Sequence, residues 1–369
     1  MFSIPIYQPT LAGNERDYVL DCIDSNWISS KGKYVNEFQD QFASYVGARY
    51  AVAVCNGTTA IHAALLALGI GEGDEVIVPT FTYVASVNAI LYTGAKPVFV
   101  DSLPDTWQVD PEDVARRISD RTKAIMGVHV YGQPCRIDQL QALAQRHRIF
   151  LLEDCAEALG SRFGTEHVGT HADVATYSFY GNKTITTGEG GMVVTSDKTL
   201  ADRLNRLRGQ GLAPYREYWH DIVGYNFRMT NICAAIGLAQ LEQIEGFLRR
   251  KRQIAARYQQ ALIGTDLTPH LEAPGTTHSY WMCSVLVARS EDRDPMRKHL
   301  ADHGIETRPL FYPVHTMPMY QSRYQRHPVA EDLAWRGINI PSWPGLSDEQ
   351  VDTVIGALRS YSPTEPRPL

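Results

Sequence analysis

Lys183 stands where a long cationic side chain is unexpected. It lies in the segment SFYGNKTITTGEGG (178–191), directly after the apolar run VATYSF and before a second apolar run, MVVTS (192–196). A lysine between two strands is usually exposed to solvent. An amine at the end of a buried strand can instead attack a carbonyl group, because burial lowers its pKa and leaves part of it uncharged. Lys183 is therefore a candidate nucleophile.

Acidic side chains follow another apolar run. IFLLED (149–154) ends in Glu153 and Asp154, and Glu157 follows three residues later. A carboxylate at the end of a buried strand is costly unless it meets a cation or hydrogen-bond donors. A helix cap or an ion pair with an arginine would satisfy these acids, and so would a cationic ligand.

Two further strand ends carry residues that suit a ligand. Asn56-Gly57-Thr58-Thr59 precedes a helical pattern, and a helix N-terminus with free amides and hydroxyls attracts anions such as phosphate. A simple helix cap is the alternative interpretation. Phe81-Thr82-Tyr83 follows the next apolar run, and an aromatic ring there can stack on a planar ligand or pack in the core.

One cofactor uses all of these features together. Pyridoxal phosphate needs an amine that bonds its aldehyde, an acid that keeps its ring nitrogen protonated, a phosphate site and a stacking surface. Lys183, Asp154, the turn at 56–59 with Ser178, and Tyr83 supply this set at the ends of the predicted strands.

The elements that must position these residues alternate regularly. Short Val/Ile-rich runs separated by helical patterns predict an α/β fold with a mostly parallel sheet. Ligands of such sheets bind at the carboxyl ends of the strands, where the candidate residues lie. The seven predicted strands are 50–55, 74–79, 96–101, 122–130, 149–154, 174–179 and 192–196.

The last third of the chain has a different pattern. Residues 231–262 form a long amphipathic helical run whose basic cluster RRKR is expected to be a solvated helix face. Short strands and helices follow, which predicts a smaller α+β domain. We expect a large domain at 1–245 and a small C-terminal domain at 246–369.

Composition excludes several classes of protein. The net charge of −6 argues against a nucleic-acid binder, because phosphate backbones require a basic surface. Six scattered cysteines without a C-x-x-C pair indicate reduced thiols in a cytoplasmic protein, and no ligand spacing suggests a metal. The sequence shows no signal peptide and no apolar run that could span a membrane.

Several longer motifs make the sequence recognisable. NGTTAIHAALLALGIGEGDEVIVPTFTYVAS, EDCAEALGSRFG, SFYGNKTITTGEGGMVVT and GYNFRMTNICAAIGLAQLE resemble the DegT/DnrJ/EryC1/StrS family of sugar aminotransferases. The likeness extends from about residue 5 to 360. It implies a fold-type I pyridoxal phosphate enzyme that works as a homodimer with its active site at the subunit interface.

The resemblance also implies roles for individual residues. Lys183 would form the Schiff base, Asp154 would pair with the ring nitrogen, and Glu157 would lie near the ring hydroxyl. Tyr83 would stack on the ring. The phosphate would be held by Gly57, Thr58 and Ser178, and by Asn226 from the neighbouring subunit. Because position 183 is lysine rather than the histidine of a deoxygenating branch, the resemblance implies transamination.

The implied reaction has two halves. L-glutamate would leave its amine on the cofactor, giving pyridoxamine phosphate, and a nucleotide-linked 4-keto-6-deoxy sugar would then accept it. SFYGNKTITTGEGG and TRPLFYPVHTMPMY are most similar to the branch that forms GDP-perosamine for O-antigen lipopolysaccharide, from GDP-4-keto-6-deoxy-D-mannose. Lys31, Tyr312 and His315 are the candidate substrate contacts, with solvent for Lys31 and a structural role for His315 as alternatives.

Other functions stay open at this point. The substrate could be a UDP- or dTDP-linked 4-keto hexose, or an eight-carbon keto sugar acid. A protein of another class, a non-catalytic regulator that only binds pyridoxal phosphate, is disfavoured because the lysine, the aspartate and the phosphate-binding turn are all present.

Overall fold

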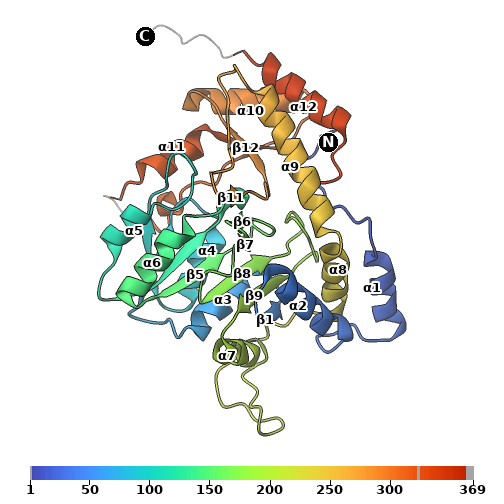
Figure 1. The fold of residues 1–369 in the computed structure, drawn as a ribbon, viewed down its shortest axis with the longest axis vertical. Helices are drawn as coiled ribbons and strands as arrows, with labels where there is room; N and C mark the ends of the chain where they lie inside the picture. The colour runs from blue at the N-terminus through green and yellow to red at the C-terminus, as the bar shows by residue number, and fades with distance from the viewer. Residues whose placement is uncertain (1, 322–324, 363–369) are drawn as a thin grey trace.

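A seven-stranded sheet forms the centre of the molecule (Figure 1). The computed structural model describes residues 2–321 and 325–362. In order across the sheet, the strands are β1 (Tyr50–Val54), β9 (Gly191–Thr195), β8 (Val174–Ser178), β5 (Phe150–Asp154), β4 (Thr122–Val128), β2 (Glu75–Pro79) and β3 (Lys96–Val100). All seven predicted strands are present. Neighbouring strands are parallel except around β9, which is antiparallel to both β8 and β1, so the prediction of a mostly parallel α/β sheet is confirmed.

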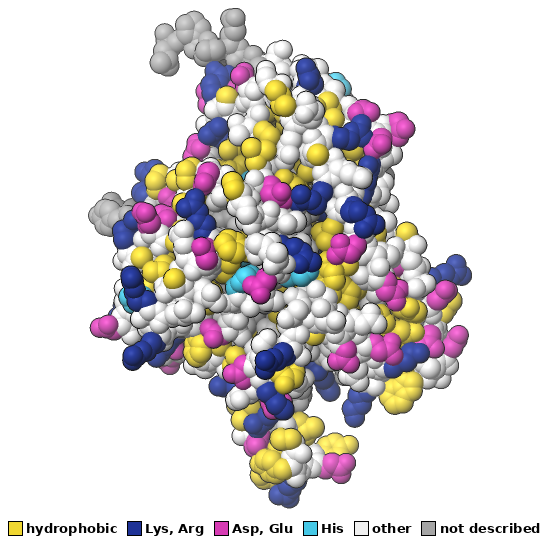
Figure 2. Space-filling model, in the orientation of Figure 1, with side chains coloured by type: hydrophobic (Ala, Val, Ile, Leu, Met, Phe, Trp, Pro, Cys, Tyr) yellow, Lys and Arg dark blue, Asp and Glu magenta, His cyan; other side chains and the backbone are white. Residues whose placement is uncertain are grey.

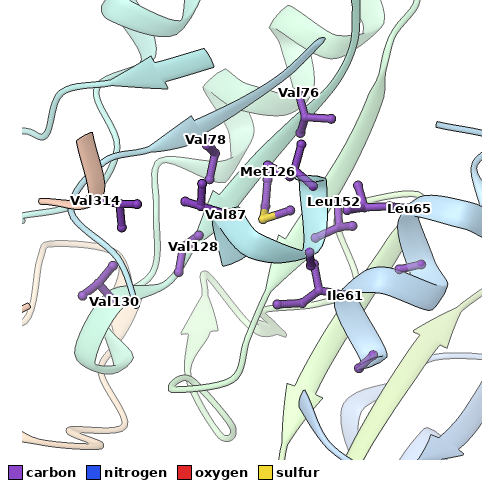
Figure 3. Close-up of a cluster of buried hydrophobic side chains, with 14 of the residues drawn as sticks. Ile61, Leu65, Val76, Val78, Val87, Met126, Val128, Val130, Leu152 and Val314 are labelled. Atoms are coloured by element: carbon purple, nitrogen blue, oxygen red, sulfur yellow. The ribbon is translucent and has the colours of Figure 1, made fainter. Parts of the chain in front are cut away.

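Both faces of this sheet are buried, which explains the unbroken apolar runs of its strands. Val76 and Val78 point to one face and pack with Leu65 and Val87 from two helices (Figure 3). Ile77 points to the other face and belongs to a separate cluster. The first face is covered by α3 (Gly57–Ala67), α4 (Val84–Tyr92) and α7 (Lys198–Arg208), and the second by α2 (Lys33–Val46), α5 (Pro111–Arg117), α6 (Ile137–His147) and α8 (Asn231–Leu241).

A smaller sheet lies above the large one in Figure 1. Its antiparallel strands are, in order, β10 (Thr268–Pro269), β12 (Cys283–Leu286), β14 (Gly337–Ile340) and β13 (Arg308–Pro309). The helices with it are α9 (Ile244–Ala261), α10 (Arg293–Asp302), α11 (Pro328–Arg336) and α12 (Asp348–Ser360). The N-terminal segment joins this unit, because Ile4 packs in its core and pairs with Ile305.

Short elements complete the fold. They are α1 (Glu15–Asp24), the three-stranded sheet of β11 (Thr276–Thr277), β6 (Arg162–Phe163) and β7 (Glu166–His167), and the 3-10 turns η1 (Val130–Gly132), η2 (Ser290–Asp292) and η3 (Val314–Thr316). The domain boundary expected between residues 245 and 246 falls at the start of α9 and stays a prediction.

The helical run at 231–262 differs from the expectation in two ways. It is divided into α8 and α9 by a break at Glu242 and Gln243. The prediction of a solvated RRKR face is wrong for Lys251, which is fully buried, whereas Arg249 is exposed. A basic side chain inside the protein needs partners, and those of Lys251 are described below.

The surface carries charges of both signs. On the face shown in Figure 2, acidic and basic side chains are interspersed, without the broad basic area that nucleic-acid phosphates require. Within residues 2–321 and 325–362, no helix is both long and apolar enough to cross a membrane.

Candidate active site

The carboxyl ends of the central strands open into a cavity of about 430 Å³. Both units contribute to its walls, because Trp281 and Phe311 of the small unit also line it. Seven of the predicted site residues line it: Gly57, Thr58, Tyr83, Asp154, Glu157, Ser178 and Lys183. Residues far apart in the sequence are thus brought to one place, as the parallel sheet predicts.

The N-terminus of α3 forms one end of this cavity. The side chain of Asn56 caps the helix by accepting a 2.8 Å hydrogen bond from the Thr59 amide. The first amides of a helix have no intrahelical partner, so those of Gly57 and Thr58 are available to an anion. Gly57 lies so close to β8 that a Cβ on it would stand 2.7 Å from Ser178 Cβ. The site therefore has a tight cradle of the kind that holds phosphate.

Asp154 is a buried carboxylate that has no cationic hydrogen-bond partner among the residues that the structure describes. Its Oδ2 accepts from Ser86 Oγ at 2.7 Å and its Oδ1 from the Ala156 amide at 3.1 Å. Burial raises the pKa of Asp154. A protonated ring nitrogen placed against this acid would offset the cost of burying its charge.

The neighbouring acid, Glu153, faces away from the cavity. Its carboxylate accepts from the Gly169 and His171 amides at 2.9 and 3.0 Å and lies 3.0 Å from His129 Nε2. His129 Nδ1 accepts from the Cys135 amide. Although His129, Glu153 and Cys155 hold three donor atoms within 4.8 Å of one another, both nitrogens of the histidine are engaged in these bonds. Adjacent side chains of β5 point to opposite faces of the sheet. Glu153 therefore makes structural hydrogen bonds, whereas Asp154 lines the cavity.

Lys183 lies between an acid and an aromatic ring. Its Nζ is 3.6 Å from Glu157 Oε1 and 3.9 Å from the centroid of the Trp281 ring. The other oxygen of Glu157 accepts a 2.8 Å hydrogen bond from the Tyr131 amide, which fixes the carboxylate. Burial lowers the pKa of Lys183 and raises the pKa of Glu157 to about 7. Burial thus brings the pKa of the amine and that of the carboxyl closer together, which favours proton exchange at this pair.

Tyr83 is not a core residue. It is 58% exposed at the mouth of the cavity, and its ring centroid is 5.7 Å from that of Phe311. Core packing, the alternative that the sequence left open, is excluded.

Tyr312 and His315 occupy different environments. Tyr312 lines a second cavity of about 720 Å³ that shares Tyr83, Trp281 and Phe311 with the first. His315 lines neither cavity, because it is buried with Nδ1 2.7 Å from Thr80 Oγ1 and Nε2 3.3 Å from Glu331 Oε1. Both ring nitrogens face protein atoms, which matches the structural alternative.

Lys31 and Asn226 lie away from the cavity of their own chain. Lys31 is exposed beside a separate hollow of about 260 Å³ that Asp21 and Asn231 also line. Asn226 is exposed, and its side-chain oxygen accepts from the Arg228 guanidinium at 3.0 and 3.1 Å. Neither residue is brought to the site by the fold of one chain.

The sequence did not reveal several residues of the site. Ser86 binds Asp154 from inside α4, and Tyr131 and Trp281 hold Glu157 and Lys183 from segments without a motif. Asn182 was visible beside Lys183, and its buried Oδ1 has no hydrogen-bond partner among the described residues. Asn182 carried a signal, its position in the SFYGNK turn, and Ser86 is the last residue of the motif that ends in FTYVAS.

Comparisons with known proteins define the class of this site. A DegT/DnrJ/EryC1/StrS aminotransferase family model matches residues 9–359. Among solved structures, DesV of S. venezuelae has a TM-score of 0.90 at 36% identity, covering 94% of this chain and 93% of its own. The pyridoxal phosphate form of the putative sugar aminotransferase Spr1654 from Streptococcus pneumoniae has a TM-score of 0.92 at 28% identity, covering 97% and 98%. Fold and site are those of a pyridoxal phosphate-dependent aminotransferase.

The chain belongs to the DegT/DnrJ/EryC1/StrS aminotransferase family. A similar curated protein is GDP-perosamine synthase of Escherichia coli O157:H7, 58% identical over 358 residues that cover 97% of this chain and 98% of the relative. The protein of the same name in Vibrio cholerae is 49% identical, covering 97% and 99%.

The residues of the cavity fit pyridoxal phosphate. The α3 cradle suits its phosphate, the uncompensated Asp154 suits its ring nitrogen, and the Lys183 amine suits its aldehyde. Tyr83 and Phe311 offer aromatic surfaces at the mouth.

Proposed function

We propose that this protein transfers the amino group of L-glutamate to the C4 keto group of GDP-4-keto-6-deoxy-D-mannose, forming GDP-perosamine. The three relatives named GDP-perosamine synthase support this substrate, at 58%, 49% and 48% identity over at least 96% of the chain. One observation carries the chemistry: a largely buried Lys183 amine lies 3.6 Å from Glu157 in the cavity that Asp154 also lines.

Each residue contributes a defined part of the reaction. Bound pyridoxal phosphate supplies an electron sink that stabilises negative charge on the substrate carbon. Asp154 would hold the proton on the ring nitrogen, and the α3 amides with Ser178 would hold the phosphate. Lys183 Nζ would hold the aldehyde of the cofactor, and its amine is placed to give and take a proton as acid and base. Glu157 stabilises the ammonium form of Lys183 between these transfers.

The second cavity is the proposed place for the sugar nucleotide. It opens from the catalytic cavity and is lined by Arg308, Tyr312 and Asn339. An arginine matches diphosphate oxygens, and a tyrosine can bind a sugar or stack on a base. Lys31 is a proposed contact from the neighbouring subunit, because it lines neither the catalytic cavity nor the second cavity of its own chain.

A homodimer is part of the proposal. The loop around residues 212–223 extends away from the body of the protein below α7 (Figure 1). Three large apolar residues of this loop are strongly exposed to solvent: Tyr215 is 70% exposed, Tyr218 91% and Val223 84%. Large apolar side chains exposed together favour a protein interface, and Asn226 at the base of this loop would reach the cofactor phosphate of the partner. We place the enzyme in the cytoplasm, where nucleotide sugars are made.

Turnover of a panel of keto sugars tests the substrate. The holoenzyme with L-glutamate is incubated with GDP-, UDP- and dTDP-linked 4-keto-6-deoxy sugars, and amino sugars are identified by mass spectrometry. We expect product from the GDP sugar. Bleaching of the visible cofactor band by glutamate, without product from the GDP sugar, would reject the substrate and keep the aminotransferase. A band that ignores glutamate would support the non-catalytic regulator.

A further inference from the structure

Lys251 is a buried cation with no acidic partner. Its side chain is 0% exposed, and within residues 2–321 and 325–362 no carboxylate lies at ion-pair distance from it. Its ammonium donates to two carbonyl oxygens, that of Trp281 at 3.1 Å and that of Ser342 at 2.7 Å. Burying a charge in this way is costly, so an apolar residue would serve packing alone better.

These two carbonyls lie at neighbouring ends of the two inner strands of the small sheet, and Trp281 also lines the cavity. Trp281 precedes β12 and Ser342 follows β14, and the two strands pair through Cys283 and Ile340. Lys251 therefore joins the ends of both strands. The ring of Tyr7, from the N-terminal segment, lies 5.8 Å from its Nζ. Three separate segments converge on one ammonium group.

Trp281 and Tyr7, which contact Lys251, also contact Lys183 and its neighbour Asn182. The Trp281 indole N–H donates to the Asn182 carbonyl at 2.7 Å, and its ring covers Lys183 Nζ at 3.9 Å. The Tyr7 hydroxyl donates to the Lys183 carbonyl. Backbone and side chain of the reacting lysine are thus both fixed by neighbours of Lys251.

We propose that Lys251 is a positioning residue for Lys183, acting through Trp281 and Tyr7. It keeps the indole over the amine, which limits the directions of Nζ and excludes water from one side of it. The arrangement matters most while Lys183 is not bonded to the cofactor and must carry a proton at a fixed place. This inference rests on Lys183 being the reacting amine of the proposed function.

The pKa of Lys183 reports on this arrangement without any cofactor or substrate. The groups facing its Nζ are Glu157, Asp154 and the Trp281 ring, and burial is the largest influence, which lowers the pKa. Without Lys251, the Trp281 ring is held less firmly and water reaches the amine, which reduces the effect of burial. This change moves the pKa of Lys183 upward.

Competitive acetylation of the full-length, cofactor-free protein measures that pKa. Acetic anhydride is applied across a pH series, and the modification of each lysine is read by peptide mass spectrometry. In Lys251→Met we expect the midpoint of Lys183 to rise by about 0.5 pH unit or more. Arg249→Met removes the same charge from an exposed site of α9 and should leave the midpoint unchanged. Exposed Lys96 serves as the internal reference.

A second variant keeps the test decisive if Lys251→Met does not fold. Trp281→Phe retains an aromatic ring but removes the indole N–H that binds the Asn182 carbonyl, so it should also raise the midpoint. An unchanged Lys183 midpoint in the folded variants, or an equal shift in Arg249→Met, would overturn the proposal.

Discussion

Glu153 and Asp154 are adjacent buried acids with opposite surroundings. Glu153 accepts hydrogen bonds from two backbone amides and contacts His129. Asp154 accepts a hydrogen bond from the Ser86 hydroxyl and lines the cavity. We therefore expect the two conservative amide variants to fail in different ways. Asp154→Asn should reduce kcat by about a hundredfold or more, because a fixed charge at the reacting group is lost, with little change in stability.

Glu153→Gln is the matched control for that variant. It should cost about 1–3 kcal/mol of unfolding free energy, because its amide group confronts donors, while the folded enzyme keeps most of its kcat. Steady-state kinetics and thermal unfolding of both variants give the comparison. Equal losses of kcat would contradict the division of roles between the two acids.

Glu157 controls the proton on Lys183. Its carboxylate, 3.6 Å away, raises the pKa of the amine and opposes the effect of burial. In Glu157→Gln the negative charge is absent, so the pKa of Lys183 should fall further below its usual value. The acetylation measurement described for Lys251 would show a midpoint at lower pH, opposite in sign to that of Lys251→Met. A midpoint that stays or rises would contradict the pairing.

At the scale of elements, the start of α3 is set by its distance from β8. Gly57→Ala would place a Cβ 2.7 Å from Ser178 Cβ, so the helix must shift away from the strand. We expect the cofactor affinity to weaken about tenfold or more, since an anion site of this kind depends on the aligned amides. Fluorescence titration of the cofactor-free protein with pyridoxal phosphate measures this.

A glycine in the first turn of another helix provides the control. A Cβ on Gly246 of α9 would meet only Arg249 Nη2, at 3.9 Å. Gly246→Ala should therefore leave the affinity unchanged and fold at least as stably. Equal affinity in Gly57→Ala and wild-type protein would show that α3 does not hold the phosphate.

The strands could be predicted from sequence because strands buried on both faces are apolar over several consecutive residues. Runs such as VIV at 76–78 are apolar on both faces, and the polar residues at their ends fall at one edge. This was enough to bring Gly57, Asp154 and Lys183 together. The reversed direction of β9 was not predicted, because short apolar runs do not encode strand direction.

Contacts between distant segments could not be predicted in the same way. Lys251 stands in RRKR, whose composition predicts exposure to solvent. It is instead buried, and its ammonium donates to two carbonyls at the strand ends of the small sheet. Trp281 meets Lys183 only because the small unit packs against the large one, and Tyr131 reaches Glu157 from the 3-10 turn that follows β4. Such residues have no local pattern, since their role arises from tertiary packing.

At the scale of the whole molecule, the proposed dimer makes a quantitative prediction. If Asn226 serves the partner's site, Lys183→Ala and Asn226→Ala subunits each lack one component that the other retains. A mixed dimer then contains one complete site. Random mixing of equal amounts should restore about a quarter of wild-type activity, because half of the dimers are mixed and each has one of two sites.

Co-expression of the two differently tagged variants provides the mixed dimers. The control is a chain that carries both substitutions, co-expressed with itself, which should stay inactive. Size-exclusion chromatography with light scattering establishes the oligomeric state. No recovery of activity in verified mixed dimers would show that Asn226 acts within its own chain.

The covalent bond between Lys183 and the cofactor is the central claim, and reduction of the holoenzyme tests it most directly. Borohydride converts a lysine–pyridoxal linkage into a stable secondary amine, which peptide mass spectrometry locates. We predict one pyridoxyl phosphate group per chain, on the peptide that contains Lys183. A saturated protein that carries no such group, or carries it on another lysine such as Lys251, would contradict the account.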